Sequence, residues 1–327
     1  MFRKTLLAAV VSLSCGTALA AETTGEIFGD FRLSLGHFDS SSPEAGGNGT
    51  ATAPDTDIDN NNSVIGLRAA TTHGGLTAFV TYERYAENDG GTTSAVNDNV
   101  SQFFYGVRGR FGEVSYGTRA TAYRMAGQKL DPFFNTSVAG VQGGLFTAAG
   151  ITSKRINGAS YGQSALTNDA LGAGTAANQI AYTAPVIFGL TANAAVFVDE
   201  GSGPNEKHDY AGGLEMNCDC GLTVGAQFLD INSNASVPNF GNSGIGGAKA
   251  EAMRAYASYN TSWWGAGLSL EKLNLRAGAL DRDYAFASGW FGLSHNTRIA
   301  AAVGHTNETP FEGVSATVGL FHDLMPN

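Results

Sequence analysis

The sequence contains no apolar run that could cross a membrane as a helix. Beyond residue 20, no stretch approaches the roughly 18 consecutive apolar residues that such a helix needs. Proline is also scarce, with 8 residues, whereas glycine is abundant, with 44. Because proline interrupts the hydrogen-bond ladder of a sheet, few prolines and many glycines favour a chain of many strands joined by tight turns.

Basic residues are fewer than acidic ones. The chain has 19 Lys and Arg against 29 Asp and Glu, a formal charge of −10, which argues against a nucleic-acid partner. The acids gather in polar stretches, which are Glu44, Asp55, Asp57 and Asp59, and then Glu87, Asp89 and Asp98. Such runs are usually solvated loops, and the more specific alternative is an acidic mouth that attracts cations.

Cysteine and histidine form no recognisable site. Cys218 and Cys220 are separated by one residue in a turn, where a disulfide would be strained. We expect them to be structural or incidental. The six histidines are scattered along the chain, whereas a metal site needs clustered ligands. The sequence therefore predicts no metal and no cofactor.

The first twenty residues have the pattern of a secretory signal peptide. Arg3 and Lys4 precede a short apolar stretch at residues 5–13, and residues 18–20 form an Ala-Leu-Ala cleavage site. We predict cleavage after Ala20, so that residues 21–327 form one exported domain. Loss of Arg3 and Lys4 changes the formal charge from −10 to −12.

One pattern repeats from residue 25 to the C-terminus: about ten residues that alternate apolar with small or polar ones, a tight turn, and another such run. The clearest example, residues 221–230, places Leu222, Val224, Ala226 and Phe228 on one face and Thr223, Gly225 and Gln227 on the other. This period indicates strands with an apolar medium on one side and a polar one on the other, and ten tilted residues cross a bilayer.

A closed sheet of such strands leaves no backbone group unpaired in lipid. We therefore predict an all-β protein, a transmembrane antiparallel up-and-down β-barrel. A secreted β-sandwich that hides two apolar faces against each other is the alternative. Fourteen strands are predicted, at residues 25–39, 62–71, 76–85, 101–111, 113–123, 178–185, 190–199, 210–217, 221–230, 253–261, 266–272, 284–292, 298–305 and 313–321.

Residues 124–177 interrupt this rhythm. They are rich in Gly, Ala, Ser and Asn and show no clean alternation. A stretch this long without regular structure is usually functional or disordered. We interpret it as a constriction loop that folds back into the barrel, with the alternative that it conceals a further pair of strands.

Several segments, taken in order, resemble the general diffusion porins of Gram-negative outer membranes over essentially the whole mature chain. They are Asn-Ser-Val-Ile-Gly-Leu-Arg at 62–68 with Gly-Gly-Leu at 74–76, Tyr-Gly-Val-Arg-Gly-Arg-Phe-Gly at 105–112 with Tyr-Gly at 116–117, Asn-Gln-Ile-Ala-Tyr-Thr-Ala-Pro at 178–185 with Phe-Gly at 188–189, and Val-Gly-Leu at 318–320. The resemblance implies a homotrimer of sixteen-stranded barrels in the outer membrane, each with an internal loop. It also implies contact with lipid and lipopolysaccharide, and passive diffusion of small hydrophilic solutes and ions.

A diffusion pore needs charged side chains at its narrowest point rather than a reacting group. Alternation places five arginines, which stay charged in any environment, on the lumen side: Arg32, Arg68, Arg108, Arg110 and Arg119. The resemblance implies that they face acids of the internal loop, where Asp131 is the nearby acid. Glu83 is also predicted to line the pore.

The alternative is that these arginines only solvate the lumen or pair with Glu26, Asp30, Glu83 and Glu113 on adjacent strands. Because screening acts over about 8–10 Å, the wall at the narrow point dominates the acidic mouth, which predicts weak anion preference or near neutrality. An outer-membrane enzyme would need a Ser/His or Asp/His constellation, and no nucleophile motif stands beside His295 or His322. A substrate-specific channel and a non-conducting structural or adhesive barrel remain as further alternatives.

Overall fold

The computed structural model describes residues 22–31, 34–38, 55–59, 63–86, 100–133, 175–198, 209–231, 250–275, 280–306 and 313–322. The predicted signal peptide lies outside these residues. Within the described ranges, no helix is long and apolar enough to cross a membrane.

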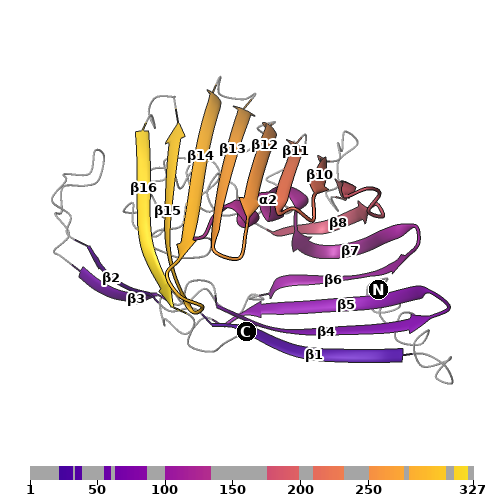
Figure 1. The fold of residues 1–327 in the computed structure, drawn as a ribbon. Coiled ribbons are helices and arrows are strands. Elements are labelled where there is room, and N and C mark those ends of the chain that lie inside the picture. Colours follow the sequence, from indigo (N-terminus) through magenta and orange to yellow (C-terminus); the bar gives the residue numbers. More distant parts are fainter. Residues whose placement is uncertain are drawn as a thin grey trace.

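Fourteen antiparallel strands form one sheet in which neighbours follow the order of the chain, from β1 at one edge to β16 at the other. Figure 1 shows this sheet curling around the helix α2 (Ala122–Leu130). The strands are β1 (Glu22–Asp30), β4 (Val64–His73), β5 (Leu76–Tyr85), β6 (Val100–Gly109), β7 (Gly112–Ala120), β8 (Thr175–Thr183), β9 (Leu190–Phe197), β10 (Asp209–Asn217), β11 (Leu222–Ile231), β12 (Ala250–Asn260), β13 (Trp264–Leu275), β14 (Leu280–Gly292), β15 (Thr297–Thr306) and β16 (Gly313–His322).

The predicted all-β, up-and-down antiparallel fold and its fourteen strands are confirmed. The sandwich alternative is wrong, because the other sheet in the described part of the chain is only the two-stranded pair β2 (Ser34–Phe38) and β3 (Asp55–Asp59). This pair corrects one prediction. The strand expected at residues 25–39 is broken between Asp30 and Ser34, and β3 lies in the stretch expected to be a polar loop.

Short turns join the strands at one end of the sheet. Gly74 and Gly75 connect β4 to β5 with φ values of 57° and 80°, a left-handed backbone that glycine adopts without steric cost. Residues 110–111, 218–221, 261–263 and 293–296 make the corresponding connections between later pairs of strands. Because strand directions alternate, α2 enters from the opposite end of the sheet, directly after β7.

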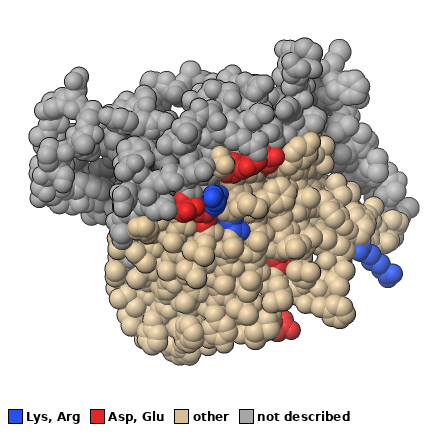
Figure 2. All heavy atoms as spheres, turned by 90° about the horizontal axis from the view of Figure 1, so that it is seen from above, with Lys and Arg blue, Asp and Glu red and all other residues tan. Residues whose placement is uncertain are grey.

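The two faces of the sheet differ in the way the alternation predicts. In β12, Arg254 and Tyr256 are buried on the concave side, whereas Met253 is exposed on the convex side. Large apolar side chains are exposed along the convex face, including Ile65, Leu67, Leu214, Val224, Phe228, Leu268, Leu270, Ile299, Val303, Val318 and Leu320. Figure 2 shows the described surface seen from above as mostly free of Lys, Arg, Asp and Glu, with several of the charged side chains grouped beside the grey atoms. An apolar outer face around a polar interior is the arrangement of a barrel in lipid.

Candidate pore constriction

The helix α2 begins where β7 ends. Thr121 is its N-cap and accepts a hydrogen bond from the backbone N–H of Arg124 at 3.1 Å, which satisfies one free donor of the first turn. The helix ends at Asp131, whose backbone N–H bonds to the carbonyl of Gly127 at 3.2 Å, and Pro132 follows. This corrects the prediction that a strand continues through residue 123.

The start of α2 is anchored to the sheet by a buried ion pair. Arg254 of β12 lies 3.0 Å from Glu271 of β13, and their side chains are 0% and 1% exposed. Arg254 also donates to the carbonyl of Tyr123 at 2.7 Å, and its guanidinium lies 4.3 Å from the centre of the Tyr123 ring. The Tyr123 hydroxyl donates to the other oxygen of Glu271. Burial, and after it the Glu271 carboxylate, raises the pKa of Tyr123 well above its usual value, so the phenol stays neutral and donates.

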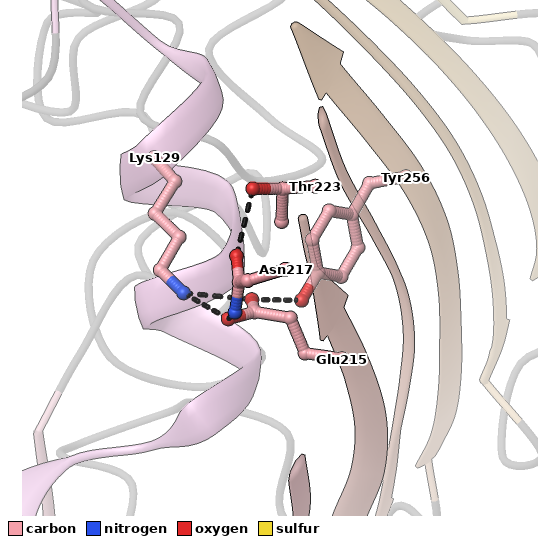
Figure 3. A network of polar contacts seen from close by, with 5 residues as sticks. All are labelled: Lys129, Glu215, Asn217, Thr223 and Tyr256. Carbon is pink, nitrogen blue, oxygen red and sulfur yellow. Dashed lines mark hydrogen bonds and ion pairs between the residues drawn. The ribbon is translucent and has the colours of Figure 1, made fainter. Parts of the chain in front are cut away.

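A second contact holds the last turn of α2. The Lys129 ammonium lies 2.5 and 2.7 Å from the two carboxylate oxygens of Glu215 on β10 (Figure 3). Tyr256 donates to the same carboxylate at 2.6 Å, and Asn217 donates to it at 2.9 Å. Asn217 in turn accepts from Thr223 at 2.8 Å. The carboxylate of Glu215 is therefore oriented from three sides, and α2 lies against the wall formed by β10 to β13.

Apolar and backbone contacts complete the attachment of α2. The carbonyl of Leu130 accepts a hydrogen bond from Ser288 of β14. Phe133 is buried, and its ring lies 5.4 Å from that of Phe321 on β16. A Cβ atom at Gly319 would lie 2.7 Å from the Phe133 ring, so only glycine leaves room for it there. The segment that follows β7 therefore narrows the interior of the sheet from one side.

Asp131 does not face the pore as predicted. It is 4% exposed, and its Oδ1 accepts from the backbone N–H of Phe133 at 2.8 Å. It is the only acid in residues 121–133, so this described part of the inner segment presents no exposed carboxylate. The physical reason for the difference is local: an acid at a helix C-cap before proline finds backbone donors in the turn that follows.

The opposite wall carries the predicted arginines. Residues paired across antiparallel strands point to the same side, so the inner face can be followed from the α2 contact. It runs from Glu271 through Arg254, Gln227, Gly213, Asn193, Thr183 and Glu113 to Arg108. The same alternation places Arg68 and Glu83 on this inner face.

Two of these arginines also have acidic partners on the wall. Arg68 lies 3.9 Å from Glu26, and both side chains are more than half exposed. Arg119 bonds to Glu113 at 3.3 Å and to Ser115 at 2.6 Å. The register shifts between Gly117 and Arg119, and the contacts of Arg119 show that it nevertheless points inward.

The other predicted pore residues differ in their outcomes. Glu83, on the inner face, accepts hydrogen bonds from Ser101 at 2.7 Å and Gln102 at 3.2 Å. Arg110 lies in the turn between β6 and β7, not on a strand, so alternation does not direct it into the lumen and that prediction needs correction. Arg32 lies outside the described residues.

The cysteines are joined. Cys218 and Cys220 form a disulfide within the turn between β10 and β11, a pairing that the sequence left open. Within the described ranges, no group of three or more His, Cys, Asp or Glu side chains is placed to hold a metal ion.

Sequence reasoning missed the residues that hold α2. Arg254 and Glu271 both occupy the polar face of predicted strands, and their position opposite each other follows once the register of β12 and β13 is known. The helix itself had a weak signal in the N-capping Thr121 and in the spacing of Tyr123, Ala126 and Leu130.

A curled antiparallel sheet with an apolar outer face, a charged inner face and a helix folded inside defines the class of membrane channels built as β-barrels. A sequence model of the Gram-negative porins matches residues 5–327, so the chain belongs to the Gram-negative porin family and lies in the outer membrane. A search of curated protein sequences finds no match.

Several solved structures share the fold. The anion-selective porin from Comamonas acidovorans is similar with a TM-score of 0.68 and 17% identity, covering 93% of this chain and 85% of that chain. OmpT of Vibrio cholerae, in its trimer form, has a TM-score of 0.58 and 14% identity, with coverage of 93% and 85%. OmpF of Salmonella typhi, in complex with daunomycin, has a TM-score of 0.55 and 12% identity, with coverage of 94% and 87%.

Proposed function

We propose that this porin forms a water-filled channel for the passive diffusion of small hydrophilic solutes and ions, with a modest preference for anions. One observation carries the preference. The described part of the inner segment has a single acid, the buried Asp131, whereas Arg68 and Arg108 are exposed on the wall opposite. An anion that passes Arg68 or Arg108 meets a guanidinium group that no carboxylate of the described inner segment offsets.

The preference is modest because acids also occupy the arginine-bearing wall. Glu26, whose side chain is 62% exposed, lies beside Arg68 and offsets part of its charge. The local field therefore favours anions without excluding cations. The solved porin from Comamonas acidovorans, which has a similar fold, is described as anion-selective, and this agrees with the proposal.

The proposal is tested by single-channel recording in a planar bilayer under a potassium chloride gradient. We expect conductance that rises with salt concentration and a reversal potential whose sign indicates selectivity for anions. The double variant Arg68→Gln with Arg108→Gln should shift the reversal potential toward cations. Lys272→Gln is the matched control, because Lys272 points to the outer face of β13 and should leave the reversal potential unchanged.

Two other outcomes would contradict the proposal of a general diffusion pore. A conductance that saturates with one solute would indicate a substrate-specific channel, and a closed barrel in liposome swelling would indicate a structural role. We also propose that the protein assembles as a homotrimer, as the trimer form of OmpT does. Light scattering of the protein in detergent should then give three times the mass of one mature chain.

A further inference from the structure

Each of three arginines on the inner wall lies over a phenylalanine ring of the neighbouring strand. The guanidinium carbon of Arg68 is 4.0 Å from the centre of the Phe28 ring. That of Arg108 is 5.5 Å from the Phe79 ring, and that of Arg119 is 4.7 Å from the Phe104 ring. All three distances are within the range in which a cation is attracted to the face of an aromatic ring. We refer to these six residues as the arginine–phenylalanine ladder.

The backbone is shaped to hold two of the rings against the wall. A Cβ atom at Gly66 would lie 2.3 Å from the ring of Phe28, and one at Gly106 would lie 2.9 Å from the ring of Phe79. Both glycines pair with the residue that bears the ring, Gly66 with Phe28 and Gly106 with Phe79. Each ring therefore occupies the space that a side chain would fill on the adjacent strand.

The ladder is continuous over part of the wall. The Phe79 and Phe104 rings meet edge to face with their centres 6.3 Å apart. This contact links Arg108, Phe79, Phe104 and Arg119 across β5, β6 and β7. Arg68 of β4 and Phe104 of β6 both pair with Thr81 of β5. One strand therefore separates Arg68 from the linked rings.

We propose that the ladder binds small planar aromatic carboxylates, of which benzoate is the simplest, as they pass through the channel. This inference rests on the proposed function as an anion-preferring pore and names a class of solute for it. A guanidinium held over a ring face still has N–H groups directed away from the ring, and these can bind a carboxylate in a bidentate manner. The aromatic ring of the same solute stacks against the exposed guanidinium or packs edge to face with the phenylalanines.

The members of the ladder contribute differently. Arg68 and Arg108 are exposed and supply the carboxylate-binding edges. The Arg119 side chain is only 14% exposed and is bound to Glu113 and Ser115, so it holds Phe104 in place. A non-aromatic carboxylate of the same charge and similar size gains the guanidinium contacts but not the ring contacts.

The test compares benzoate with cyclohexanecarboxylate as blockers of chloride current through single channels of the full-length mature protein. Cation–π and ring contacts at exposed sites predict that benzoate blocks at a concentration about two- to fivefold lower than cyclohexanecarboxylate does. Equal block by the two carboxylates, or no block by either, overturns the inference even if the channel prefers anions. A wild-type channel that prefers cations, or that does not conduct, instead overturns the proposed function.

A variant removes two of the three rings without removing charge. In the double variant Phe79→Leu with Phe104→Leu, the advantage of benzoate over cyclohexanecarboxylate should decrease, because only Phe28 beside Arg68 remains. The matched control is Phe103→Leu, because Phe103 neighbours Phe104 in β6 but points outward, where its ring contacts Tyr82. A benzoate advantage that is undiminished in the double variant contradicts the inference. The wild-type comparison decides the question if the double variant does not assemble.

Discussion

The hydroxyl of Tyr123 donates a hydrogen bond to Glu271, a residue 148 positions later in the chain. This bond joins the first turn of α2 to the inner wall of β13, and the same carboxylate accepts from Arg254. The inner segment is therefore attached to the sheet through one buried carboxylate that serves both partners. The chemistry of this carboxylate leads to the first three predictions.

Replacing Tyr123 by Phe should loosen the start of α2 while leaving the ring in place. A hydrogen bond to a charged group contributes about 1.5–3 kcal/mol, so backbone amides of α2 should exchange with deuterium roughly tenfold to a hundredfold faster. Hydrogen exchange followed by mass spectrometry measures this effect. Tyr259→Phe is the control, because Tyr259 is exposed on the outer face of β12. Equal exchange in wild type and variant would contradict the assigned role of the hydroxyl.

The raised pKa of Tyr123 determines how the difference in stability of α2 between wild type and Tyr123→Phe depends on pH. A group whose pKa is raised by folding contributes stability that is fully present below its unfolded pKa, which is about 10 for tyrosine. The contribution is lost as the pH rises through the folded value. We therefore expect the difference between wild type and Tyr123→Phe to stay constant from about pH 6 to about pH 9.

Removing one charge of the buried pair should cost more than removing both. Glu271→Gln leaves the Arg254 guanidinium buried without its carboxylate, which destabilises the fold by about 3–5 kcal/mol. The double variant Arg254→Met with Glu271→Leu should cost clearly less than the sum of the single variants, because no unpaired charge remains. Urea unfolding in detergent measures both. Simple additivity would show that the two side chains act independently.

Changes at Lys129 and Glu215 should move ion selectivity in opposite directions. Lys129→Gln leaves the Glu215 carboxylate facing the lumen and should shift the reversal potential toward cations, whereas Glu215→Gln should shift it toward anions. Because the Lys129 side chain is about half exposed, the loss of the ion pair itself should cost at most about 1 kcal/mol. The charge-swapped double variant should return the reversal potential toward that of wild type. Shifts in the same direction for both single variants would contradict this assignment.

Gly106 should not tolerate even one added methyl group. A Cβ atom there would lie 2.2 Å from the carbonyl oxygen of Val114 and 2.9 Å from the Phe79 ring. Gly106→Ala should destabilise the barrel by about 1–3 kcal/mol through overpacking, seen as a lower temperature for heat-dependent gel migration. Gly289→Ala, whose Cβ would have its nearest neighbour at 3.4 Å, should migrate like wild type. If the two variants behave alike, the crowding at Gly106 is relieved by movement of the strand.

Much of the barrel could be predicted from the alternation of apolar and polar residues, because successive side chains of a strand face lipid and water in turn. The fourteen strands of the main sheet and the inward side of Arg68, Arg108 and Glu83 follow from that period. The pair β2 and β3 was missed because the acid-rich run at residues 55–59 lacks the apolar half of the pattern. Arg110 was misplaced for the opposite reason, because alternation was extended into a turn.

The sequence alone determined the membrane-facing side of each strand, because a one-residue slip would move every apolar side chain of that strand into the lumen. Only the tertiary structure decided what the lumen contains. The contacts of Tyr123 with Glu271 and of Lys129 with Glu215 join residues far apart in the chain, and they depend on how the inner segment enters the curled sheet. Local composition does not specify that path, and so the buried Asp131 and the stacked rings become apparent only when strands and helix are brought together.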